Sequence, residues 1–259
     1  MKYRFWDIET APQSGYYWQA KTTYINDSMQ EQCTTLLCIS WKDSDEDEIH
    51  NIRVPYSDIR NDERVVKKAN ELLNEAADKG IIIVHQNGDR FDYKKVRARN
   101  RFYGFDPLPE IKKDLLTIDT LKEARRSAFD YNRLDYLDKH LHGAQAGKVE
   151  TRGWLMWRDI VSIHSSKAKV KQALDEMVEY CDGDITSLER VFNTLLPDMK
   201  LPNRLLFNGQ VDGCPSCGSK SYVKNAIRYT ATRAYQSYRC LDCKKRFQDT
   251  GSTRGSSFK

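Results

Sequence analysis

The chain has 259 residues, of which 39% are hydrophobic and 31% are charged, and its formal net charge is +5. This length suits one sizeable domain with a small appendage, whereas no apolar run approaches the roughly 18 residues of a membrane span, which excludes an integral membrane protein. The first residues form no apolar signal region. The chain has seven cysteines, four of them in Cys-x-x-Cys pairs, which predict a cytoplasmic protein with a metal site rather than a disulfide framework.

Hydrophobic periodicity predicts strands and helices along the first three quarters of the chain. The first strand covers residues 2–8, and residues 15–31 form a loop with a short helix. The next predicted elements, in chain order, are strands over 35–41 and 48–54 joined by the acidic turn 43–48, an amphipathic helix over 62–78, a buried strand over 81–84, a helix over 91–102, a short strand over 115–118 and at least three helices up to Leu196. This order is typical of a mixed α/β domain.

Acidic residues within these elements form the most informative pattern. Asp7 and Glu9 stand two apart at the end of the first strand, so they share a face. Tyr180 and Asp184 stand four apart in a predicted helix, so they also share a face. Asp92 comes from a third element. Hard oxygen ligands in this number favour Mg²⁺ or Mn²⁺ over zinc, and two such ions in one site cleave phosphodiester bonds.

The order of these residues resembles the DEDD superfamily of 3′→5′ exonucleases, which have a ribonuclease-H-like fold. The resemblance runs from Tyr3 to about Leu196, and residues 119–121 and 132–137 are similar to the family's segment between its second and third motifs. The three motifs, the third in its tyrosine form, are Asp7-Ile8-Glu9-Thr10, Asn87-Gly88-x-x-Phe91-Asp92 and Tyr180-x-x-x-Asp184.

The resemblance implies a ribonuclease-H-like mixed sheet flanked by helices. It also implies that Asp7, Glu9, Asp92 and Asp184 hold two Mg²⁺ or Mn²⁺ ions about 3.5–4 Å apart, and that the product is a nucleoside 5′-monophosphate. Tyr180 would position the attacking water, because a phenol with a pKa near 10 is mostly protonated at neutral pH.

Two further aspartates compete for places in these motifs. Asp182 lies beside Asp184, but the residue four before it is Val178, which does not fit the tyrosine form. Asp89 lies three residues before Asp92, and it is interpreted as a loop or N-cap residue.

The last quarter of the chain differs in charge and in cysteine content. Residues 200–259 carry 12 Lys and Arg against 3 Asp, whereas residues 1–199 carry 30 against 34 Asp and Glu. Two Cys-x-x-Cys pairs, 22 residues apart, match the spacing of a four-thiolate zinc site that folds a segment too small for its own apolar core. The four predicted zinc ligands are Cys214, Cys217, Cys240 and Cys243.

Cations and aromatic residues lie between and around these cysteines. Cations bind phosphates without reading sequence, and aromatic rings stack on unpaired bases, so this segment is expected to bind nucleic acid. Alternatively, Tyr222, Tyr238 and Phe247 form the segment's own small core. The residues concerned are Tyr222, Lys224, Arg228, Tyr229, Arg233, Tyr235, Tyr238, Arg239, Lys245, Arg246 and Phe247.

Other positions have weaker signals. His85 could line the site and Gly88 could let a nucleotide approach the backbone. The basic run 94–101 could bind phosphate or be a solvated helix face, and Trp18 and Tyr24 could stack on a base or pack at the sheet edge. Structural roles are expected for the remaining candidates, which are Cys33, Cys38, Cys181, His140, His142 and His164.

The sequence therefore predicts a metal-dependent 3′→5′ exonuclease acting on single-stranded 3′ ends, with residues 1–199 as the exonuclease domain, 200–212 as a linker, 213–250 as the zinc ribbon and 251–259 as a polar tail. Two alternatives stay open, which are a nucleic-acid-binding or regulatory protein on a nuclease scaffold, and a structure-specific endonuclease of the same fold. The ribbon could also bind a protein partner.

Overall fold

The computed structural model describes residues 2–16, 26–32, 34–143, 146, 151–199, 213–214, 216–229, 233–248 and 252–253. Its largest element is a five-stranded sheet in the order β5-β4-β1-β6-β7, in which β4 runs antiparallel to β1 and β5, and β6 runs parallel to β1 and β7. These strands are β1 (Tyr3–Thr10), β4 (Leu36–Asp43), β5 (His50–Arg53), β6 (Ile82–His85) and β7 (Thr117–Asp119).

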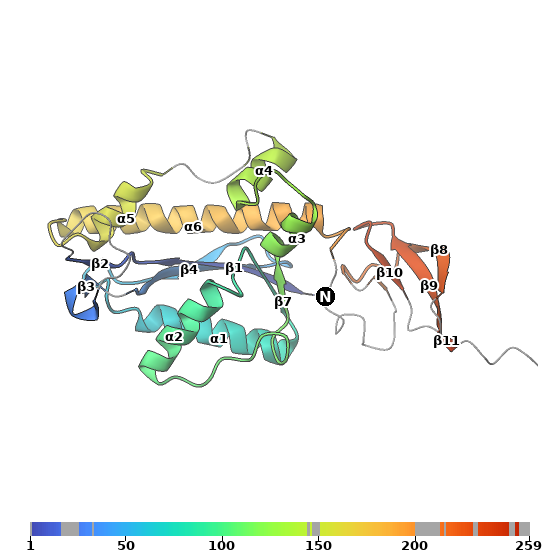
Figure 1. Cartoon of the computed structure of the whole chain (residues 1–259), viewed down its shortest axis with the longest axis horizontal. Helices are drawn as coiled ribbons and strands as arrows, with labels where there is room; N and C mark the ends of the chain where they lie inside the picture. Colours follow the sequence, from blue (N-terminus) through green and yellow to red (C-terminus); the bar gives the residue numbers. More distant parts are fainter. Residues whose placement is uncertain are drawn as a thin grey trace, which may run out of the picture.

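Helices cover both faces of this sheet. The long helix α6 (Lys167–Leu195) crosses one face, and α1 (Glu63–Lys79) and α2 (Asp92–Tyr103) cover the other (Figure 1). On the α6 side lie three shorter helices, α3 (Thr120–Arg126), α4 (Leu134–His142) and α5 (Trp154–Val161). The predicted α/β fold, a mixed sheet flanked by helices, is confirmed.

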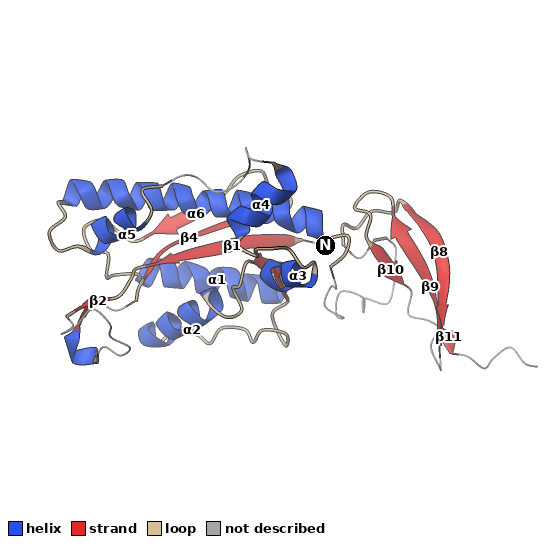
Figure 2. Cartoon of the chain, turned by 45° about the horizontal axis from the view of Figure 1, so that its top comes forward, coloured by secondary structure: helices blue, strands red, loops and turns tan. Residues whose placement is uncertain are grey.

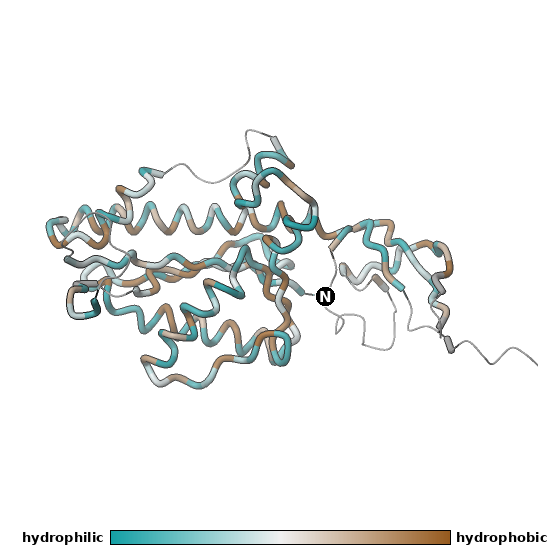
Figure 3. Tube along the Cα trace, viewed as in Figure 1, coloured by the Kyte–Doolittle hydropathy of each residue, from teal (hydrophilic) through white to brown (hydrophobic). Residues whose placement is uncertain are grey.

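Strand β1 is the middle strand of this sheet, and its side chains are buried on both faces. Tyr3 and Phe5 contact the ring of Phe192 on α6, with centroids 4.9 and 5.4 Å apart. Trp6 and Ile8 belong to the cluster that contains the buried residues of α1. Hydrophobic and hydrophilic stretches alternate along α6, as expected of a helix with one buried face (Figure 3). Since side chains alternate along a strand, Asp7 and Glu9 lie on the α6 side with Tyr3 and Phe5.

The segment after β1 contains only short elements. A small antiparallel pair joins β2 (Ser14–Gly15) to β3 (Gln30–Gln32), next to the 3-10 helix η1 (Asp27–Met29). Trp18, Tyr24 and Cys33 lie outside the described residues.

A second sheet follows α6 in the chain. Strand β9 (Arg233–Cys240) pairs antiparallel with β8 (Tyr222–Tyr229), β10 (Arg246–Gln248) and β11 (Ser252–Thr253) (Figure 2). Tyr222, Tyr238 and Phe247 contact one another with ring centroids 5.4–5.5 Å apart, so these three aromatic residues form the core of this sheet.

Hydrogen bonds between described residues join the segment that contains this second sheet to β1 and to the end of α6. The Tyr3 hydroxyl, at the start of β1, donates a hydrogen bond of 2.7 Å to the carbonyl of Ser216. The ammonium of Lys245 donates to the carbonyls of Leu196 (3.1 Å) and Met199, which follow the last turn of α6. These carbonyls lack helical partners. Lys245 is buried, so the prediction that it contacts phosphate is wrong, because its charge is used to cap α6.

Among the described residues, no helix combines the length and the apolar composition that a membrane span requires.

Candidate active site

Three carboxylates converge between β1 and α6. Asp7 and Glu9 from β1 and Asp184 from α6 each present an oxygen atom, and these atoms lie within 4.8 Å of one another. Asp184 is buried, whereas Asp7 and Glu9 are half-buried. Such close like charges repel one another unless a cation lies between them, and carboxylate oxygens are the ligands that Mg²⁺ and Mn²⁺ prefer. The donor set therefore fits a divalent cation.

Asp92 approaches β1 from the first residue of α2. The pairing of β1 with β6 ends at Phe5 and Val84, and beyond it the backbone N–H of Ile8, between Asp7 and Glu9, donates a hydrogen bond to the Asp92 carboxylate. Burial raises the pKa of Asp92 to about 6, although the nearby charge of His85 and the backbone hydrogen bonds oppose this rise. Asp92 thus lies against the strand that carries Asp7 and Glu9, but outside the compact three-carboxylate group.

Tyr180 lies on α6, four residues before Asp184. Its ring meets the edge of Trp157 from α5, with centroids 5.6 Å apart and an interplanar angle of 83°. Helix α5 therefore supports the tyrosine from one side. Trp157 has no motif around it and stands only in an apolar helical spacing, so a role beside Tyr180 could not be predicted from the sequence.

Asp182 is not part of the group of three carboxylates. Its two oxygens accept hydrogen bonds from the Ser40 hydroxyl on β4 (2.6 Å) and the Asn51 amide on β5 (3.0 Å). Burial raises the pKa of Asp182, and these two hydrogen bonds oppose the rise. Asp182 thus links α6 to the sheet, which leaves Asp184 as the helix carboxylate that faces Asp7 and Glu9.

The turn between β6 and α2 is braced by His85 and Asp89. His85 is only 2% exposed; its Nε2 lies 2.9 Å from an Asp89 oxygen, and its Nδ1 accepts a hydrogen bond of 2.8 Å from the backbone N–H of Gly88. Asp89 also accepts hydrogen bonds from Thr117 (2.9 Å) and Lys122 (2.5 Å). Burial alone would raise the pKa of Asp89, but the hydrogen bonds from His85, Lys122 and Thr117 hold it well below its usual range.

These contacts change two interpretations made from the sequence. Asp89 is a loop residue but not the N-cap of α2, which is Phe91. His85 is buried and braces the turn rather than lining an open site. The close approach at Gly88 is that of the His85 ring, because a Cβ on Gly88 would lie 2.5 Å from the His85 Cγ.

Replacing Gly88 with alanine is expected to destabilise the protein by about 1–3 kcal/mol, the usual cost of overpacking, and to lower metal-dependent activity by displacing the turn that carries Asp92. Thermal unfolding and activity measurements test this. The double variant Gly88→Ala/His85→Ala removes the clash and should regain part of the stability that Gly88→Ala loses. A Gly88→Ala variant with unchanged stability would show that the turn relaxes freely.

A second acidic group is part of an ion-pair network. Asp43, Asp45 and Glu46 also present oxygens within 4.8 Å of one another. The buried Arg4 guanidinium holds Asp43 at 2.6 Å, and Lys2 lies 2.8 and 2.9 Å from Asp43 and Asp45. Burial would raise the pKa of Asp43, but Arg4 and Lys2 lower it. Asp43 and Asp45 are thus already paired with cations of the protein, so this second group lacks the character of a divalent metal site.

The four predicted zinc ligands come together at the end of β9, from the segment before β8, from Cys240 itself and from the turn between β9 and β10. Their sulfurs lie within 4.8 Å of one another, with 3.6 Å from Cys214 to Cys243 and from Cys217 to Cys240. These distances exceed the roughly 2.05 Å of a disulfide. Burial would raise the pKa of Cys240, but the backbone N–H groups of Cys243 and Asp242 and neighbouring thiols lower it to about 7. The cluster is compatible with a zinc ribbon.

The basic residues near this cluster divide into two kinds. Lys245 is buried against α6, whereas Lys224, Arg239 and Arg246 are exposed. The side chains of Arg228, Tyr229 and Arg233 lie outside the described part of the structure, and Tyr235 is half-buried. In the basic run of α2, Arg99 is bound to Asp62 at 2.6 Å and is therefore structural, while the exposed members are Lys94, Arg97 and Arg101.

The weaker candidates have mostly structural surroundings. His142 lies 2.9 Å from Asp138 and 2.8 Å from the Thr194 hydroxyl, and His140 stacks on Tyr136. Cys38 and Cys181 are buried, and the Cys181 sulfur lies 3.7 Å from a carboxylate oxygen of Asp7. His164 is exposed.

A family model, RNase_H_2 of the RNase_H superfamily, matches residues 22–196. The chain therefore belongs to the RNase H superfamily, which supports nuclease activity, that is, phosphodiester hydrolysis with divalent metal ions. The matched segment includes Asp92, Tyr180 and Asp184 and begins after Asp7 and Glu9.

Among solved structures, the chain is similar to the family B DNA polymerase from the hyperthermophilic archaeon Pyrobaculum calidifontis, with a TM-score of 0.52 and 16% identity. The match covers 76% of this chain and 24% of the polymerase chain, so this chain spans about a quarter of that protein. At this identity the likeness shows the fold alone. No curated protein matches the sequence.

Proposed function

We propose that this chain is a metal-dependent exonuclease that removes nucleoside 5′-monophosphates from the 3′ ends of nucleic-acid strands. The observation that carries the proposal is the convergence of Asp7, Glu9 and Asp184 from β1 and α6. Asp92, hydrogen-bonded to the strand between Asp7 and Glu9, would complete a set of four ligands for two Mg²⁺ or Mn²⁺ ions.

When bound, such ions supply a water of lowered pKa and stabilise the charge on the leaving oxygen. The protein's own part is to place the strand and the water. Tyr180 is on the same helix face as Asp184 and is supported by Trp157, so its hydroxyl would hydrogen-bond and orient the attacking water in line with the phosphorus. The proton of that water leaves to solvent or to a neighbouring carboxylate.

Tyr180→Phe removes only this hydroxyl. It is expected to lower kcat by roughly 10²–10⁴-fold, the usual size of a lost positioning or acid–base group, while KM changes little because the ring remains. Steady-state kinetics on a labelled oligonucleotide measure both constants. Tyr93→Phe is the matched control, since the Tyr93 hydroxyl donates to the Pro109 carbonyl, a structural contact. An unchanged kcat in Tyr180→Phe would make the tyrosine structural.

The direction and mode of cleavage are tested with three strands that carry the same sequence. One is a linear strand with a 5′ label, one has a blocked 3′ end and one is a closed circle. A 3′→5′ exonuclease shortens only the first, with loss of single nucleotides. Cleavage of the circle would identify an endonuclease, and retention of all three uncut would identify a binding protein. DNA and RNA versions of the linear strand separate the two substrates.

The same proposal assigns residues 1–199 to the exonuclease domain, 200–212 to a linker, 213–250 to a zinc ribbon with one Zn²⁺ and 251–259 to a polar tail. The exposed Lys224, Arg239 and Arg246 support a role of the ribbon in holding the strand. Tyr222, Tyr238 and Phe247 do not contribute to that role, because they form the ribbon's core.

A further inference from the structure

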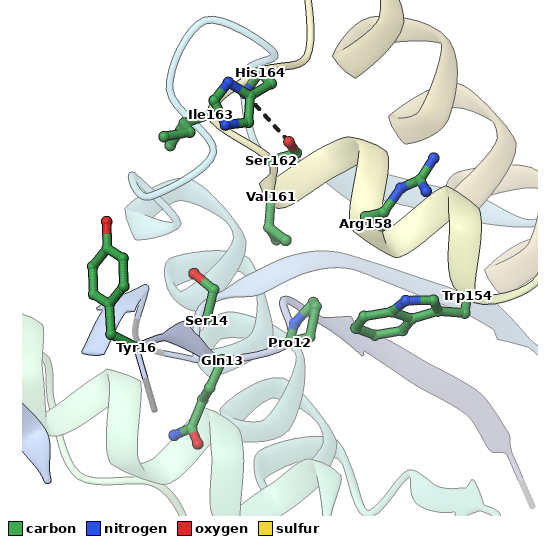
Figure 4. Close-up of a pocket in the computed structure, with 10 residues that line it drawn as sticks. All are labelled: Pro12, Gln13, Ser14, Tyr16, Trp154, Arg158, Val161, Ser162, Ile163 and His164. Atoms are coloured by element: carbon green, nitrogen blue, oxygen red, sulfur yellow. Dashed lines mark hydrogen bonds between the residues drawn. The ribbon is translucent and has the colours of Figure 1, made fainter. Parts of the chain in front are cut away.

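A pocket of about 360 Å³ lies beyond the end of β1, which is within the size range of small-ligand sites. One wall is the segment after β1, with Pro12, Ser14 and Tyr16, and the other is α5 and the turn that follows it. Figure 4 shows Trp154 near one end of the pocket, Tyr16 near the opposite end and Pro12 between them.

Both walls lie close along the chain to residues of the candidate active site. Pro12 follows Glu9 by three residues, and three residues of chain span at most about 10 Å. Arg158 follows Trp157, whose ring contacts Tyr180. A strand whose end lies at the carboxylates could therefore place its next nucleotides in this pocket.

The lining differs from the neighbouring carboxylate site in charge. None of the residues that line the pocket is acidic, and Arg158 and His164 are among them. The buried Asp159 carboxylate is shared by three cations, with distances of 2.8 Å to Arg152, 3.0 Å to Lys169 and 3.2 Å to Arg158. Glu176 also pairs with Arg152, at 2.7 Å, so two carboxylates face three cations. Arg158 has the longest of the three distances to Asp159 and a side chain that is 53% exposed, so it retains positive charge for an anionic ligand.

The lining also exposes apolar and aromatic surface. Trp154 is 63% exposed and Tyr16 is 66% exposed. Aromatic rings beside a cation, in a lining that contains no acidic residue, have the chemistry that stacks on unpaired bases while the cation contacts the phosphate backbone.

We propose that this pocket binds the unpaired nucleotides adjacent to the strand end, with Trp154 stacking on a base and Arg158 contacting a backbone phosphate. The inference rests on the nucleic-acid substrate proposed above. It assigns the expected preference for a single-stranded end to this pocket, because a paired base keeps its faces within the duplex stack.

The test measures equilibrium binding of a fluorescent single-stranded oligonucleotide to the full-length protein, with Ca²⁺ in place of Mg²⁺ and a gel to confirm that the strand stays intact. Trp154→Ala is expected to weaken binding about 10-fold, the usual effect of losing one stacked base. Arg158→Gln should weaken binding and lower the slope of log K against log salt by about 0.7. Tyr56→Ala, an exposed aromatic in another loop, should change neither.

A strand without bases at its three 3′-terminal positions separates stacking from a folding defect. The wild-type protein should bind this abasic strand about as weakly as Trp154→Ala binds the normal strand. Trp154→Ala should then lose no further affinity on the abasic strand, whereas Arg158→Gln should still lose affinity, since the phosphates remain. Further weakening in Trp154→Ala on the abasic strand would overturn the stacking assignment.

The outcomes distinguish this inference from the proposed activity. A wild-type protein that binds in the expected pocket-dependent way but cleaves no strand in Mg²⁺ or Mn²⁺ would overturn the exonuclease proposal and support the pocket. A protein that cleaves strands, with Trp154→Ala and Arg158→Gln binding like wild type, would overturn the pocket inference and leave the exonuclease proposal intact.

Discussion

Replacing Asp184 with asparagine is expected to abolish metal-dependent hydrolysis, with a loss of about 10³-fold or more, because charge stabilisation at the reacting phosphate depends on the ions that the carboxylates hold. Asparagine keeps the size of the side chain and removes its charge, so the fold should remain. The measurement is the initial rate of strand shortening in saturating Mg²⁺ or Mn²⁺, together with isothermal titration of the metal. Both the rate and the metal affinity should fall.

Asp182→Asn is the matched control on the same helix. Asp182 accepts hydrogen bonds from Ser40 on β4 and Asn51 on β5, and it does not belong to the close group of Asp7, Glu9 and Asp184. Its substitution should cost stability, by about 1 kcal/mol, and leave the metal affinity near that of the wild type. If Asp182→Asn is inactive and Asp184→Asn is active, the assignment of the helix carboxylate is wrong.

Replacing Cys240 with serine is expected to release the zinc ion and unfold the second sheet. Zinc binding to four thiolates provides about 10 kcal/mol or more of apparent free energy, and the sheet has only a small core of its own. Metal analysis of the purified protein should find less than one zinc per chain, and limited proteolysis should cut within β8 and β9. Cys38→Ala, a buried cysteine outside the cluster, should retain the zinc.

Loss of zinc should also lower the thermal stability of the first domain. Tyr3 and Lys245 are bound across the boundary, so the midpoint of thermal unfolding of the remaining domain should fall in Cys240→Ser. Binding to nucleic acid should weaken and depend less on salt, because the exposed cations of the ribbon no longer act together. Full zinc occupancy in Cys240→Ser would contradict the four-thiolate assignment.

The parts of the site that the sequence predicted are those set by local geometry. Asp7 and Glu9 share a face because of the two-residue period of a strand, and Tyr180 and Asp184 share one because of the helical period. The place of Asp92 depends instead on a turn held by His85, Gly88 and Asp89, and no periodicity encodes that turn. The strands and helices of the first domain were predictable in the same way, because hydrophobic periodicity is also a local property of the sequence.

Contacts between distant segments were not predictable in this way. Lys245 has the same sequence context as its exposed neighbours Lys244 and Arg246, and only the position of the end of α6 makes it a buried cap. Trp157 and the pocket beside it depend on how α5 lies against α6 and against the segment after β1. Tertiary packing decides such positions, and a single sequence does not display it.

The carboxylates that converge in this fold come from opposite parts of the chain, with Asp7 and Asp184 separated by nearly the whole first domain. During synthesis, β1 leaves the ribosome early. Asp7 and Glu9 can approach Asp184 only after α6 has been synthesised. Contacts of such long sequence separation form late and slowly. A ribosome-bound or prematurely terminated chain that stops before Asp184 lacks one of the three carboxylates, so such nascent chains should be inert toward nucleic acid cleavage even where β1 and α2 have already folded.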